Sequence, residues 1–187
     1  MNQNNQTINY DLGHFEGFNF RTESAIERAL TAQDIVAWNH DRDGEAEFWP
    51  AGNKPELSVV FEGQNCVTAS ELLALASLLD DLGGDTQENY LSVYFAVAIH
   101  GGSLGKLTAD QIRDQAPCCF FGTNFTDVRR EAAFELFELY YPELYRIWES
   151  TPCDGLIFDT DRFLDSPSLT VAEVHLGSEV AVLVSLW

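Results

Sequence analysis

The chain has 187 residues, of which 45% are apolar and 12% aromatic, so it can bury the core of a folded domain and is not a disordered acidic tail. Thirty Asp and Glu against ten Lys and Arg give a formal net charge of −20. A field of that sign repels nucleic acid and anionic membranes and attracts basic partners, which argues against direct DNA or RNA binding.

No targeting or membrane signal is visible in the sequence. The opening residues, MNQNNQTINY, lack the apolar core of a signal peptide, and no stretch approaches the ~20 apolar residues that span a bilayer. The four cysteines form no C-x-x-C pair, which makes a zinc site a poor prediction. We therefore expect a cytoplasmic protein with reduced thiols and no cofactor.

The first third of the chain predicts short elements. Residues 1–20 are rich in Asn and Gly and predict an irregular segment. Two helices are expected next, at 22–30 and 31–41, from their apolar spacing. Two strands then follow at 46–50 and 56–63, the second with Val59 and Phe61 on one face.

The rest of the chain is mainly helical until its last segment. Helices are predicted from apolar spacing and from Gly or Pro at their ends, over 68–84, 85–102, 108–115, 126–141 and 142–150. The second of these is so apolar that a buried strand remains an alternative. Strands are predicted at 118–122 and 155–159, and a hairpin over 169–187 that turns at Gly177 and Ser178.

Helices thus occupy the middle of the chain and strands gather towards both ends, without the alternation of βαβ units. This order predicts an α+β fold in which an antiparallel sheet packs against several helices. No repeat, linker or low-complexity block divides residues 1–187, so we expect a single domain.

The stretch NHDRDGEAEF resembles the start of a calcium loop. Asn39, Asp41, Asp43 and Gly44 occupy the first, third, fifth and sixth positions of such a loop. The twelfth position, where a bidentate Glu is required, is Pro50, which has no side-chain oxygen. An acidic turn explains the same residues, so no calcium site is predicted.

A second group of carboxylates lies in CDGLIFDTDRFLD. Asp154, Asp159, Asp161 and Asp165 could together bind a divalent cation, and a metal-dependent hydrolase using them is the alternative function. Asp159 and Asp161 are the weak metal candidates. The chain has no P-loop, G-x-S-x-G or H-E-x-x-H signature, however, so we expect a protein that is not an enzyme.

The helix over 126–141 carries a more informative pattern. Asp127, Glu131, Glu135 and Glu138 recur at intervals of four, four and three residues, which places all four carboxylates on one helical stripe. Like charges at this spacing destabilise a helix by about 0.2–0.5 kcal/mol per pair, and no basic residue lies in the last two turns to offset them. We call this set the acid stripe; an ordinary solvated face remains the simpler explanation.

The acid stripe and the scarcity of lysine resemble, in composition, the acidic DNA-mimic proteins of phages and plasmids that inhibit host defence, of the anti-restriction and anti-CRISPR type. The resemblance implies a non-catalytic inhibitor that binds a basic nucleic-acid-binding protein or complex and excludes DNA by charge and bulk. The residues predicted to contact the partner, besides the stripe, are acids and two aromatic anchors: Asp41, Asp43, Glu45, Glu47, Asp80, Asp81, Tyr141 and Trp148.

A third hypothesis is an α+β interaction module whose acidic surface only maintains solubility. It differs from the mimic in the expected distribution of acid, which is diffuse in the module and concentrated in the mimic. The sequence leaves the oligomeric state open, and a dimer would double the acidic surface.

Overall fold

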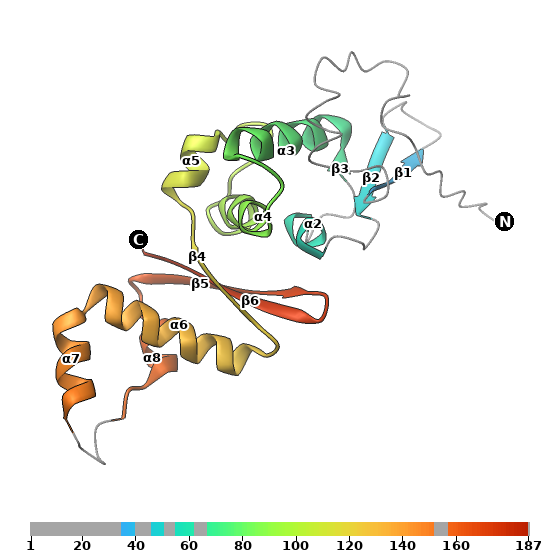
Figure 1. Ribbon diagram of the computed structural model, residues 1–187. Coiled ribbons are helices and arrows are strands. Elements are labelled where there is room, and N and C mark those ends of the chain that lie inside the picture. The colour runs from blue at the N-terminus through green and yellow to red at the C-terminus, as the bar shows by residue number, and fades with distance from the viewer. Residues whose placement is uncertain (1–34, 40–45, 51–54, 62–66, 152–156, 187) are drawn as a thin grey trace. The chain divides into compact units, whose positions relative to one another are not determined.

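The computed structural model describes residues 35–39, 46–50, 55–61, 67–151 and 157–186 (Figure 1). The chain divides into two compact units, Met1–Ala116 and Pro117–Trp187, here called the N-terminal and C-terminal units. The predicted irregular segment 1–20, the predicted helix 22–30 and the acids Asp41, Asp43, Glu45 and Asp154 lie outside the described residues. Whether the two units form the expected single domain stays a prediction.

The core of the N-terminal unit is helical. Its helices are α2 (Pro55–Val60), α3 (Ala69–Leu82), α4 (Gln87–Tyr94), the π-helical turn η2 (Phe95–Ile99) and α5 (Ala109–Asp114). Leu57, Leu75, Leu79, Tyr90 and Ile112 are fully buried in one cluster. The predicted helices over 68–84, 85–102 and 108–115 are confirmed, the second of them as α4 continued by η2.

A small antiparallel sheet, ordered β1-β2-β3, is the other part of this unit. It consists of β1 (Ile35–Asn39), β2 (Ala46–Pro50) and β3 (Val67–Thr68), with Ala37 opposite Phe48. The predicted strand 46–50 is confirmed. The helix predicted over 31–41 is wrong for Ile35–Asn39, because pairing with β2 overrides the weak local preference for helix.

The strand predicted over 56–63 is also wrong for residues 56–60, which belong to helix α2 (Pro55–Val60); residues 62 and 63 lie outside the described residues. Pro55 is the first helical residue, where proline is favoured, and Glu56 follows it in the first turn. Leu57, Val60 and Phe61 are buried at helical spacing, so one face of α2 covers the core. The alternating apolar pattern of this segment concealed that spacing.

The C-terminal unit is one sheet covered by helices (Figure 1). Its elements are β4 (Cys118–Gly122), α6 (Phe125–Tyr140), α7 (Pro142–Ser150), α8 (Thr160–Leu164), β5 (Leu169–Leu176) and β6 (Glu179–Leu186). The strand order is β4-β6-β5 and every pairing is antiparallel. The predicted strand 118–122, helices 126–141 and 142–150, and the hairpin are confirmed; Gly177 turns the hairpin at φ 69°. The strand predicted over 155–159 is wrong for residues 157–159, which are irregular and lead into α8; residues 155 and 156 lie outside the described residues.

Helix α6 lies on one face of this sheet. Val128, Ala132 and Leu136 recur on its buried side and pack in one cluster with the alternate β6 residues Val180, Val182 and Val184. The α+β fold with an antiparallel sheet against helices is thereby confirmed. Across the part of the chain that the structure describes, no helix is long and apolar enough to cross a membrane.

Candidate functional site

The sequence around residue 124 fixes where α6 begins. The Asn124 side chain accepts a hydrogen bond from the Asp127 backbone N–H at 2.9 Å and donates one to the Asp127 carboxylate at 2.8 Å. Helix α6 starts at Phe125, one residue before the predicted Thr126. Gly122 lets β4 approach this helix closely, because a Cβ there would lie 2.5 Å from Val128 Cγ2.

The four carboxylates of the acid stripe are all exposed on α6. Asp127 has protein partners, since it bonds with Asn124 and forms an ion pair with Arg130 at 3.2 Å. Within the described residues, Glu131, Glu135 and Glu138 form no ion pair and no side-chain hydrogen bond. Among the residues that the structure describes, three of the four predicted acids therefore have no neutralising partner.

Arg129, which follows the stripe's first acid, points to a different set of groups. The Arg129 side chain is 21% exposed, and its guanidinium contacts Asp161 and Asp165 at 3.2 Å and Glu173 at 2.5 Å. These contacts join α6 to β5 and to α8 and its C-terminal cap. The hydrogen bond with Glu173 is the main reason why the pKa of Arg129 is raised above its ordinary value. This arginine consequently does not neutralise the acid stripe.

The described carboxylates of the hydrolase alternative have partners within the protein. Asp161 and Asp165 bind Arg129, and Asp159 caps α8 by accepting a hydrogen bond from the Arg162 backbone N–H at 3.0 Å. Among the described residues, no three His, Cys, Asp or Glu side chains are grouped as metal ligands. The weak metal candidates Asp159 and Asp161 thus have structural roles in this unit.

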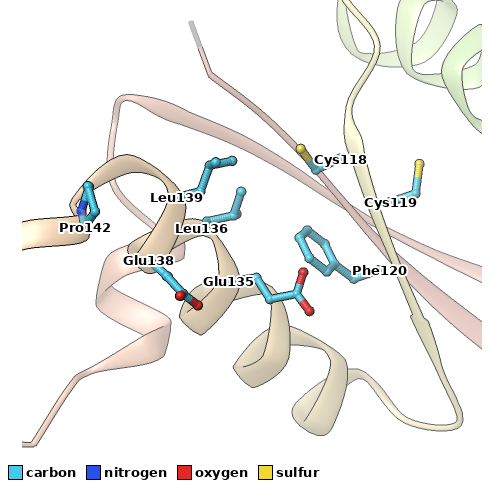
Figure 2. A pocket seen from close by; sticks show the side chains of 8 residues that line it. All are labelled: Cys118, Cys119, Phe120, Glu135, Leu136, Glu138, Leu139 and Pro142. Atoms are coloured by element: carbon cyan, nitrogen blue, oxygen red, sulfur yellow. The ribbon is translucent and has the colours of Figure 1, made fainter. Parts of the chain in front are cut away.

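A groove of about 750 Å³ lies between α6 and β4 (Figure 2). We call it the α6–β4 groove; its lining residues are Cys118, Cys119 and Phe120 of β4, Glu135, Leu136, Glu138 and Leu139 of α6, and Pro142. Figure 2 shows the Glu135 side chain extending from α6 towards β4, where Phe120 lies. The acid stripe therefore borders a concave, partly apolar surface.

The pKa of the Cys118 thiol depends on its surroundings in the groove. Burial raises the pKa of its thiol, and the charge of Glu135 raises that pKa further. Glu135 of α6 and Cys118 of β4 both line the groove, so the carboxylate and the thiol share one concave surface.

We expect the alkylation of Cys118 by iodoacetamide to be slow at neutral pH, because the thiolate is the reactive form. In a Cys119→Ser background, Glu135→Gln should move the midpoint of the pH–rate profile to lower pH, as measured by peptide-resolved mass spectrometry. Glu131→Gln, which removes the same charge outside the groove, should leave the midpoint in place. An unmoved midpoint in the Glu135 variant would contradict an effect of that carboxylate on the Cys118 thiol.

The two predicted aromatic anchors differ in their surroundings. Tyr141 is exposed, at the point where α6 meets α7. Trp148 is half-buried on the inner side of α7, with its ring centroid 5.4 Å from that of Phe134 and 6.3 Å from that of Phe158. Trp148 therefore holds α7 to α6, and any contact with a partner would use only its exposed edge.

Sequence reasoning missed a set of exposed aliphatic side chains near the stripe. Leu139 is 64% exposed, and Leu144 and Ile147 are exposed on α7. The sequence pattern of α7 could have indicated them. Leu144 and Ile147 are three residues apart, and so are Tyr145 and Trp148, one residue further along the helix. That spacing gives α7 two apolar sides, of which only the inner one is packed.

The other predicted contact acids belong to the N-terminal unit. Asp80 and Asp81 are exposed at the end of α3, where the Asp81 carbonyl accepts a hydrogen bond from Arg113. Glu47 lies in β2, opposite Trp38 and Thr68 in the strand register. Their part in binding stays a prediction.

Comparison with known proteins does not assign a family. No protein-family model matches the chain, and neither a curated protein nor a solved structure matches it.

Proposed function

We propose that this protein is a non-catalytic acidic inhibitor. It binds a basic nucleic-acid-binding protein or complex of a host defence system and keeps DNA out of that protein's binding channel. The observation that carries the proposal is a row of three carboxylates on α6, Glu131, Glu135 and Glu138, which have no ion pair among the residues that the structure describes. Such a row imitates the regular negative charge of a nucleic-acid backbone.

The charge balance of the C-terminal unit supports the proposal. Twelve acidic residues stand against four basic ones, and both lysines, Lys54 and Lys106, lie in the N-terminal unit. Three of the four arginines, Arg129, Arg130 and Arg146, are engaged in ion pairs. A basic partner would therefore meet few positive groups on this unit.

Exposed apolar side chains at the end of α6 and on α7 support a protein partner rather than a purely ionic one. Leu139, Leu144 and Ile147 are exposed at the end of α6 and on α7. Protein interfaces have an apolar core within a polar rim, while charges steer encounter and select the partner.

The test is affinity capture with the tagged full chain from its native host, followed by identification of the retained nucleic-acid-binding proteins and competition with duplex DNA. Neutralising Glu131, Glu135 and Glu138 to Gln should weaken binding roughly 3- to 150-fold, since exposed ion pairs contribute about 0.2–1 kcal/mol each. Raising the salt concentration should weaken the wild-type complex in the same direction.

A matched control removes three exposed carboxylates elsewhere, with Glu88→Gln, Asp114→Asn and Glu179→Gln. This variant has the same net charge as the stripe variant, so retained affinity would show that position matters as well as total charge. Capture of no nucleic-acid-binding protein, or equal loss in both variants, would refute charge mimicry by the stripe.

A further inference from the structure

The α6–β4 groove combines an apolar surface with two carboxylates. Its apolar lining is formed by Phe120, Leu136, Leu139 and Pro142, and its α6 side carries the carboxylates of Glu135 and Glu138 (Figure 2). A long-chain cation is the complement of such a surface, because it lays its methylene stem on apolar groups and keeps its charged end beside oxygen.

The carboxylates of the groove are not already satisfied. Within the described residues neither Glu135 nor Glu138 has an ion pair or a side-chain hydrogen bond. They are three residues apart on one helix, so their Cβ atoms are neighbours at roughly 5–6 Å and their charges repel. A cation seated between them would relieve that repulsion.

We infer that the α6–β4 groove receives an arginine side chain from a segment of the partner protein. This inference deepens the proposed function and rests on it for the class of partner. The guanidinium pairs with Glu135 and Glu138 and lies against the Phe120 ring, which lines the same groove. Arginine fits better than lysine, because its planar fork pairs with carboxylates in two places, stacks on aromatic rings and is less strongly hydrated.

The size of the groove indicates a chain segment rather than a lone side chain. Its volume of about 750 Å³ lies in the ~300–1,000 Å³ range of sites that enclose ligands much larger than one side chain. Leu139 is 64% exposed at its edge, so an apolar residue next to the arginine can pack there. A second copy of this chain is a poor occupant, because two molecules of charge −20 repel.

The experiment uses the full-length, ¹⁵N-labelled protein and a defined probe, the peptide acetyl-Leu-Arg-Leu-amide. Its control replaces arginine by citrulline, which keeps the shape and removes the charge. We expect saturable amide shifts confined to residues 118–120 and 135–142, and affinity for the citrulline peptide weaker by roughly tenfold or more. Free arginine, which lacks the flanking apolar groups, should also bind more weakly than the peptide.

Two double variants complete the test. Glu135→Gln with Glu138→Gln should abolish the preference for arginine over citrulline, while Glu131→Gln with Glu179→Gln, equal in charge and outside the groove, should preserve it. Far-UV circular dichroism checks that both variants keep the fold. Equal binding of the two peptides, shifts outside the groove, an unaffected groove variant, or free arginine binding as tightly as the peptide would each overturn the inference.

The probe is independent of the natural partner, so the two failures can be told apart. A negative peptide titration with successful capture of a nucleic-acid-binding protein refutes the groove inference alone. A positive titration with no such capture refutes the proposed function and leaves the groove an arginine-binding site.

Discussion

Leu136→Ala is expected to lower the free energy of unfolding by about 2–5 kcal/mol. The Leu136 side chain is 1% exposed and packs with Val180, Val182 and Val184 of the central strand, so its truncation leaves a cavity under α6. Urea denaturation followed by circular dichroism measures the change. The free energy should fall through a lower midpoint, with little change in the slope.

Leu139→Ala is the matched control, one helical turn later on the same helix. Because Leu139 is 64% exposed, its truncation should change the free energy of unfolding by no more than about 0.5 kcal/mol. Similar losses in the two variants would mean that α6 is rotated from the orientation that exposes Leu139 and the acid stripe.

Arg129→Gln should lower the free energy of unfolding by about 1–3 kcal/mol. The substitution leaves Asp161, Asp165 and Glu173 facing one another without their shared cation. The loss should be smaller than the ~3–5 kcal/mol of a fully buried pair, because the three carboxylates remain exposed to water. Arg129→Lys should be intermediate, since an ammonium group cannot reproduce the planar fork.

Urea titrations at low and high salt separate this network from simple packing. Added salt should bring the stability of the Arg129→Gln protein closer to that of the wild type, because salt screens the exposed carboxylates from one another. Arg130→Gln serves as the control, because among the described residues Arg130 forms only an exposed ion pair, with Asp127. Its loss should lower the free energy of unfolding by less than about 0.5 kcal/mol. If the difference in the free energy of unfolding between the wild type and Arg129→Gln did not change with salt, the guanidinium would act mainly by packing.

Local signals explain which parts of the fold could be predicted from the sequence. Helices α3 and α6 have clear apolar periodicity, and the β5–β6 hairpin has a glycine at its turn. β1 could not be predicted in this way, because its conformation depends on pairing with β2. Helix α2 could have been predicted from Pro55 and from the spacing of Leu57, Val60 and Phe61. A short apolar segment, however, fits both a helix pattern and a strand pattern.

The candidate site, like the fold, could be predicted where local geometry decides and not where tertiary contacts decide. Helical geometry alone placed the acid stripe on one face of α6, with its acids exposed. It could not show that Asp127 is held by Asn124 and Arg130 while Glu135 is unpaired among the described residues. The α6–β4 groove could not be predicted from the sequence, because it requires β4 to lie beside α6. That placement depends on the pairing of β4 with β6.

The central strand of the C-terminal unit, β6, is also the last element of that unit in the sequence. β6 pairs with both β4 and β5, and it follows every other helix and strand of the unit in sequence. During synthesis, the apolar side of α6 therefore has no sheet to cover until residues 180–184 have left the ribosome. The β5–β6 hairpin can form locally, but the pairing of Cys118 with Val184 closes a long loop and should be the slow step. The groove beside the acid stripe consequently appears only when this unit has folded to completion.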